Sequence, residues 1–182
     1  GPRVLCGRGR RCIGAGRGGG RGDGGLGSVS LLANGGCGAV GGGGGDDWIE
    51  SRNGQGVLMF GDAGAPTGGQ ALYSGNDVMI GGPAGGDIMK GFSGDDIMVG
   101  GGSFTKFIGG LGWDWGSYEM AVHGVTEDMN RKEFIAPNGS EDSIRDIWQH
   151  TEGASGSAFD DIIIGTNDTR LLATKDELDN IS

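Results

Sequence analysis

The 182-residue chain is poor in the residues that build an ordinary globular core or a zinc site. It contains four prolines, two histidines and three cysteines, and apolar residues make up 35% of it. His123 and His150 have no metal-ligand spacing to each other or to a cysteine. The odd cysteine count argues against a disulfide framework. Because no run of 18 apolar residues occurs, the sequence predicts no membrane-spanning helix.

Glycine is the commonest residue, at 45 of the 182 positions, far above its ordinary share of ~7%. Glycine loses the most entropy on ordering and buries no side chain, so a single conventional core is not expected. Residues 41–182 hold eight basic and 23 acidic residues, a net charge of −15. A segment so acidic and so rich in glycine is expected to stay largely unfolded until the repulsion is removed.

Residues 91–117 read as three consecutive nonapeptides, each with glycine at its first position. The first and third also have glycine at position four, Gly94 and Gly112, and aspartate at position six, Asp96 and Asp114. Glycine permits a tight turn, and the last three positions suit a short strand whose central apolar side chain points inward. Two nonapeptides make one coil, so the two aspartates, 18 residues apart, should stack at roughly one strand spacing, ~4.8 Å.

Two carboxylates that close repel each other unless a cation lies between them. Carboxylate and carbonyl oxygens are hard ligands that suit calcium better than zinc or copper. On the opposite edge of the coils the register places Asp87 and then Thr105, whose single neutral oxygen predicts a weak or missing site. The candidate metal ligands at all these turns are Asp47, Asp77, Asp87, Asp96, Asp114 and Asp161, with Gly75, Gly82, Gly91, Gly94, Gly110 and Gly112. The inward positions, expected to form a packed apolar seam, are Met79, Met89, Met98 and Phe107.

The pattern Gly-Gly-x-Gly-x-Asp-x-U-x, with U a large apolar residue, resembles the calcium-binding nonapeptide of RTX (haemolysin-type) proteins. The resemblance implies a parallel β-roll in which each ion lies between successive turns on one edge, held by position-six aspartates and turn carbonyls. It also implies a secreted, extracellular bacterial protein that the type I secretion apparatus exports unfolded. Such modules bind calcium at roughly 10⁻⁴ to 10⁻³ M, and binding drives their folding.

Composition divides the chain into four segments. Residues 1–40 hold six arginines and one acid and are expected to be disordered low-complexity sequence or the product of repeat DNA read in a shifted frame. Nucleic-acid binding by this segment is not expected, because no aromatic residue is interleaved with the arginines. Residues 41–117 are expected to form the roll, with an irregular stretch at 60–74 where Asp62 is a further candidate ligand.

Residues 118–152 lack the repeat. The apolar spacing and the serine cap at residues 140–150 predict one short amphipathic helix. Residues 153–182 are expected to be a degenerate terminal repeat and a truncated tail, which suggests a fragment. The fold class predicted for the whole chain is therefore all-β, a parallel β-roll with a helix-containing insertion and a disordered N-terminus.

Residues 113–181 are similar to the calcium-binding tail of large bacterial haem peroxidases of the animal type. None of the haem-site or catalytic motifs of that family can be placed here, so the sequence predicts no catalytic residue and no cofactor besides calcium. An alternative is that the chain is the C-terminal fragment of a large secreted enzyme whose catalytic domain is absent. A third interpretation, a structural or adhesive repeat that needs little metal, is opposed by the recurring aspartates.

Overall fold

β-Strands are the only regular secondary structure among the residues that the structure describes. The computed structural model describes residues 3–5, 20–33, 37–51, 56–62, 74–82, 86–101, 104–131 and 146–166. These ranges contain no helix, so the expected all-β class is confirmed for them. In particular, none of their segments is an apolar helix of bilayer length, as the sequence predicts.

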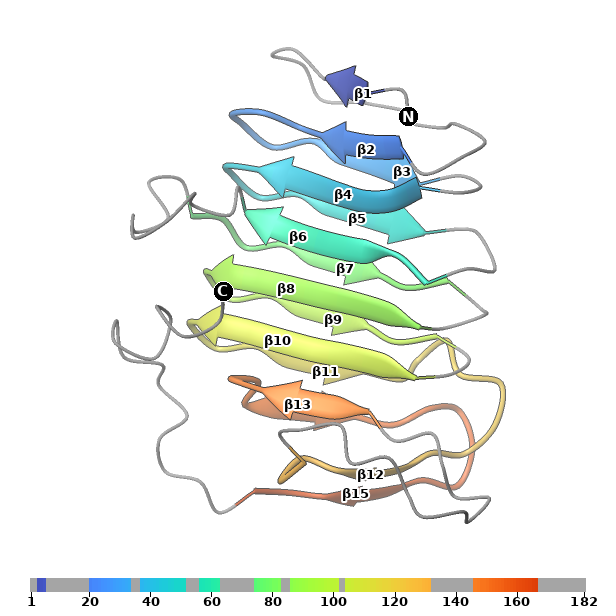
Figure 1. Cartoon of the computed structure of the whole chain (residues 1–182). Helices are drawn as coiled ribbons and strands as arrows, with labels where there is room; N and C mark the ends of the chain where they lie inside the picture. The colour runs from blue at the N-terminus through green and yellow to red at the C-terminus, as the bar shows by residue number, and fades with distance from the viewer. Residues whose placement is uncertain are drawn as a thin grey trace.

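Two parallel sheets hold thirteen of the fifteen strands. The first sheet contains, in spatial order, β1 (Arg3–Leu5), β2 (Gly20–Asp23), β4 (Cys37–Gly43), β6 (Leu58–Asp62), β8 (Asp87–Ser93), β10 (Thr105–Leu111) and β13 (Ile147–Gln149). The second contains β3 (Ser30–Ala33), β5 (Trp48–Ser51), β7 (Val78–Ile80), β9 (Ile97–Val99), β11 (Trp115–Ser117) and β14 (Gly153–Ser155). Successive strands largely alternate between the sheets, so each sheet stacks in chain order (Figure 1).

A third, smaller sheet lies beyond the stack and pairs β12 (Thr126–Asp128) with β15 (Ile162–Ile164), again in parallel. Figure 1 shows this pair at the C-terminal end of the two large sheets. The strands of the second sheet and of this pair are three or four residues long, whereas β4, β8 and β10 of the first sheet reach seven residues.

Strand pairing places matching repeat positions directly opposite each other. Met79 pairs with Met98, 19 residues later, and Ile49 pairs with Met79, 30 residues later. The inward apolar residues stay paired with each other, although both spacings exceed the 18 residues of a regular coil of two nonapeptides. The extra residues are therefore accommodated between strands, because a slip of one residue within a strand would turn its apolar side chain outward.

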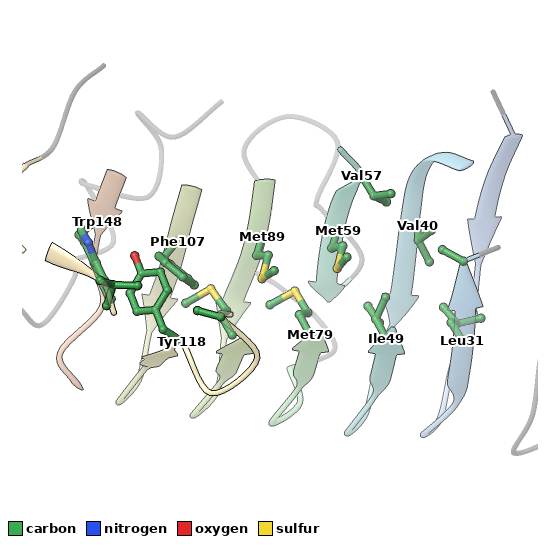
Figure 2. Packing of buried hydrophobic residues seen from close by; sticks show 14 of the residues in the cluster. Leu31, Val40, Ile49, Val57, Met59, Met79, Met89, Phe107, Tyr118 and Trp148 are labelled. Carbon is green, nitrogen blue, oxygen red and sulfur yellow. The ribbon is translucent and has the colours of Figure 1, made fainter. Parts of the chain in front are cut away.

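The core is a row of apolar side chains between the two sheets. The inward residues of the middle strands, Ile49, Met59, Met79, Met89, Met98 and Phe107, have no exposed surface. Figure 2 shows such side chains pointing from the strands of both sheets into the space between them. The apolar seam expected from the sequence is confirmed.

Aromatic rings close the core at its C-terminal end. Phe107 stacks on Trp148 with ring centroids 4.6 Å apart, and Tyr118 meets Phe107 edge-on at 5.6 Å. Trp148 belongs to β13, which pairs with β10. Residues 140–145 of the expected helix lie outside the described residues. Residues 147–149 form a strand, so the helix prediction is wrong there. The strand gives the open edge of β10 backbone hydrogen-bond partners and buries Trp148 fully.

Strands β2 and β3 lie within residues 1–40, the segment expected to be disordered. Residues 24–32 read Gly-Gly-Leu-Gly-Ser-Val-Ser-Leu-Leu, a nonapeptide with Val29 in place of aspartate. Leu31 pairs with Ile49 of the next strand and is buried. This coil therefore keeps the inward apolar residue but lacks the aspartate, so the aspartate pattern alone does not reveal it.

Candidate metal centre

The candidate site is built at the turns that lead from the first sheet to the second. Each turn ends at an aspartate placed directly before a strand of the second sheet: Asp96 precedes β9 and Asp114 precedes β11. The fourth-position glycines, Gly94 and Gly112, have φ of 121° and 135°. Side chains other than glycine disfavour these backbone angles, which explains the glycine at this point of the turn.

Four of the predicted aspartates form one continuous column, which we call the aspartate column: Asp47, Asp77, Asp96 and Asp114. Their exposed fractions are 3%, 1%, 1% and 0%. The backbone N–H of each donates to Oδ1 of the next, over 2.8, 2.8 and 2.9 Å. The column extends at both ends, since Val29 N–H donates to Asp47 Oδ1 at 2.8 Å and Asp114 N–H donates to Glu152 Oε2 at 2.7 Å.

The second carboxylate oxygen, Oδ2, has no hydrogen-bond partner at any of the four aspartates and is buried. Each Oδ2 lies against the glycine that opens its turn. A Cβ atom added at Gly42, Gly61, Gly91 or Gly109 would come within 2.1, 2.1, 1.8 or 2.2 Å of it. A buried, unpaired carboxylate oxygen is costly, and its recurrence at four successive turns points to a missing positive partner.

A carbonyl oxygen accompanies each of these unpaired oxygens. The same added Cβ at Gly91 would lie 2.8 Å from the Gly109 carbonyl oxygen, and the one at Gly61 would lie 3.0 Å from the Gly91 carbonyl oxygen. At Gly109 the neighbouring carbonyl is that of His150, 2.0 Å from such an atom. The column therefore repeats one donor pair: an aspartate Oδ2 and a carbonyl oxygen from the next coil.

The other predicted turn glycines also stack on one another. A Cβ added at Gly94 would lie 1.8 Å from the Gly75 carbonyl oxygen, and one at Gly112 would lie 2.0 Å from that of Gly94. Gly110 N–H donates to the His150 carbonyl at 3.1 Å. Side chains are excluded from these positions, so backbone oxygens remain the nearest donors to the turns.

The electrostatics of the aspartate column favour a bound cation. Burial, together with neighbouring carboxylates, raises the pKa of Asp77 and of Asp96 to about 8. Burial likewise raises the pKa of Asp114 to about 7 and that of Asp47 to about 6. At neutral pH the metal-free column must retain protons or bear unneutralised charge, and a cation removes both costs.

The donor set fits calcium. Carboxylate and carbonyl oxygens are the ligands of calcium, which accepts six to eight of them in flexible geometry. In the described ranges, no three side chains of His, Cys, Asp or Glu converge on one point. An ion in the column would therefore draw on backbone carbonyls, as calcium does and as zinc does not.

The opposite edge is built differently. Asp87 is buried, but both of its oxygens are paired: Oδ1 accepts from Val57 N–H at 2.9 Å and Oδ2 from Gly82 N–H at 3.0 Å. Its neighbour Thr105 donates its backbone N–H to Asp146 Oδ1 at 2.6 Å. Both carboxylate oxygens of Asp87 therefore have hydrogen-bond partners, and neither is left unpaired for an ion.

Asp161 lies apart from the aspartate column, beside the small sheet. Its Oδ1 accepts from Val125 N–H at 2.8 Å, and its Oδ2 accepts from Ser157 N–H at 2.7 Å. These hydrogen bonds, led by the one from Val125, lower its pKa. Asp161 repeats the contact between neighbouring coils seen in the column, but it has no unpaired oxygen.

Sequence reasoning missed Glu152, which caps the column at Asp114. Glu152 follows Asp114 by 38 residues and lies outside the nonapeptide pattern, so no periodicity points to it. Asp62, a candidate from the irregular stretch, is fully buried. The chemistry that the column itself supports is the coordination of hard divalent cations by repeated oxygen pairs. No protein-family model, curated protein or solved structure matches the chain.

Proposed function

We propose that this chain is a calcium-binding β-roll in which ions lie between successive turns of the aspartate column. One observation carries the proposal. Each aspartate of the column holds one buried Oδ2 with no hydrogen-bond partner, beside a carbonyl oxygen of a neighbouring coil at the turns that begin with Gly61, Gly91 and Gly109. A calcium ion would give each of these oxygens a partner and would neutralise the stacked carboxylates.

Calcium binding would be coupled to folding. Without the ion, four buried carboxylates oppose the packed state, and the glycine-rich turns lose much entropy on ordering. With the ion, the free energy of binding is added to that of folding, because the unfolded chain holds no formed site. Magnesium would substitute poorly, since it demands near-octahedral geometry at 2.0–2.1 Å and gives up its water reluctantly.

The setting we propose is extracellular. The resemblance of the nonapeptide to RTX proteins supports export by a type I secretion apparatus, which passes chains unfolded. A module with affinity in the extracellular range of roughly 10⁻⁴ to 10⁻³ M would stay unfolded where calcium is scarce and would fold after export.

The test is a calcium titration of the full chain, followed by far-ultraviolet circular dichroism, with magnesium as control. We expect strand signal to appear with calcium and not with magnesium. Asp96→Asn should raise the half-saturating calcium concentration at least ~10-fold, because it removes a charge that faces two coils and affinity follows the ligand charge count. Asp95→Asn removes the same charge from an exposed residue of the same turn and should change little. Equal responses from the two variants would contradict the site assignment, and a flat wild-type titration would contradict the function.

A further inference from the structure

One buried carboxylate beside the aspartate column has no counterpart in the other turns. Asp62 ends β6 and pairs in register with Gly43 of β4. In the next two strands of the sheet, Phe92 and Gly110 pair with each other at the corresponding turn position. The nonapeptide pattern has no acidic residue there, so Asp62 is an addition specific to this turn.

The side chain of Asp62 is completely enclosed. Its exposed fraction is 0%, and neither of its carboxylate oxygens has a partner in good hydrogen-bond geometry, although the backbone N–H groups of Ser93 and Gly75 lie near enough to lower its pKa. Leaving both oxygens of a carboxylate buried and unpaired costs more than leaving one. Asp62 is therefore the least satisfied polar side chain among the described residues, in a fold that pairs both oxygens of Asp87 and Asp161.

Asp62 faces the aspartate column. The residue before it, Gly61, lies against Asp77 Oδ2, which is also unpaired. Burial and then the charge of Asp77 raise the pKa of Asp62 to about 8; the Ser93 backbone N–H opposes this increase, and the charge of Asp47 adds a smaller one. The charge of Asp62 in turn raises the pKa of Asp96. Asp62 and Asp77 together hold three buried carboxylate oxygens without a partner in good hydrogen-bond geometry.

We propose that Asp62 and Asp77, with the Gly91 carbonyl oxygen, form a divalent-cation site that binds calcium more tightly than the other turns of the column. This inference rests on the proposed function and adds a rank order to its sites. At the other turns the carboxylates are the column aspartates and Glu152, each of which accepts a backbone N–H from the coil before it, whereas this turn adds Asp62 from outside that series. Calcium affinity rises with the number of charged ligands, so this site fills first and orders the coils on either side of it.

The experiment measures calcium binding to the full chain by equilibrium dialysis against calcium chloride, for the wild type, Asp62→Asn and Asp114→Asn. Asp114→Asn is the matched control, because it also removes one buried column carboxylate, but at a turn whose second carboxylate, Glu152, accepts the backbone N–H of Asp114 as the column aspartates do for one another. We expect Asp62→Asn to abolish the tightest class of sites, with its first half-saturation shifted ~10-fold upward. Asp114→Asn should leave that class in place and weaken only later binding.

A second readout separates ligation from support of the fold. Asp62→Asn removes a buried carboxyl group, so the metal-free variant should show at least as much strand signal by circular dichroism as the metal-free wild type, while its calcium response falls. A residue that only supported the fold would lower both. If Asp62→Asn does not fold even with calcium, Asp62→Gly replaces it, since glycine stands at the matching position 43.

The possible outcomes distinguish a failure of the proposed calcium-binding function from a failure of the Asp62 site. A wild type that binds no calcium overturns the proposed function and this site with it. A wild type that binds calcium, with Asp62→Asn or Asp62→Gly retaining the tightest class, overturns only the assignment of Asp62. Loss of that class in the Asp62 variant and its retention in Asp114→Asn establishes the site.

Discussion

The metal-free protein should become less stable as the pH rises, a consequence of the raised pKa values in the aspartate column. The pKa of Asp77 and Asp96 lies near 8 in the folded chain, against an ordinary value of 3.8. The folded state therefore binds more protons than the unfolded state between these limits. In that case the free energy of unfolding falls with pH. The stabilisation is complete below about pH 4 and is lost as the pH approaches 8.

The magnitude is large compared with the stability of a small domain. One pKa unit corresponds to about 1.4 kcal/mol. If the four aspartates of the column each contribute a single unit, the loss is about 5 kcal/mol, at the lower end of the 5–15 kcal/mol by which domains are stable. Asp161, whose pKa is lowered, acts in the opposite direction, but it is one exposed group against four buried ones.

The assay is circular dichroism of calcium-free protein at pH 5.5 and pH 8, which reports how much of the chain is folded without the ion. Both values lie above the isoelectric point of 4.5, so the net charge keeps its sign. We expect the strand signal to fall between pH 5.5 and pH 8 without calcium, and calcium to restore it at pH 8. A calcium-free strand signal that rises with pH would refute the raised pKa values, because it would mean that the column carboxylates gain favourable partners on folding.

Two substitutions test the packing that holds the site. Gly91→Ala would place a methyl group 1.8 Å from Asp96 Oδ2, so we expect a loss of ~1–3 kcal/mol by urea denaturation and a weaker calcium response. Gly38→Ala, in strand β4 with open space around the added atom, is the control and should be neutral or slightly stabilising; equal losses from both would contradict a specific cradle at Gly91. Trp148→Ala removes the fully buried ring stacked on Phe107 and should cost ~3–5 kcal/mol of unfolding free energy in saturating calcium. A loss below ~1 kcal/mol would show that the aromatic end of the core does not support the stack.

The nine-residue period is sufficient to predict which residues share an edge. Glycine at the turns and one apolar residue in each short strand place Asp96 and Asp114 in one column and turn Met79 and Met98 inward. The same pattern runs through residues 24–32, although Val29 replaces the aspartate. The inward apolar position, rather than the aspartate, therefore marks that coil in the sequence.

Other features depend on residues brought together from distant parts of the chain. Residues 147–149 pair with β10 because that strand presents an open edge, a partner that their helical spacing does not reveal. Asp47 and Asp77 join one column across 30 residues, because the intervening sequence is accommodated between strands.

The sequence by itself therefore determined the strand class, the spacing of the turns and the identity of the aspartate column, because these follow from a local repeat. Only the tertiary structure decided which oxygens in the turns have partners. Asp87 and Asp96 occupy the same repeat position, yet Asp87 has both oxygens paired and Asp96 has one left over. Asp62, outside the repeat, has two. The physical reason is that hydrogen bonding at each turn depends on which residues the neighbouring coil brings to it, which a nine-residue pattern does not encode.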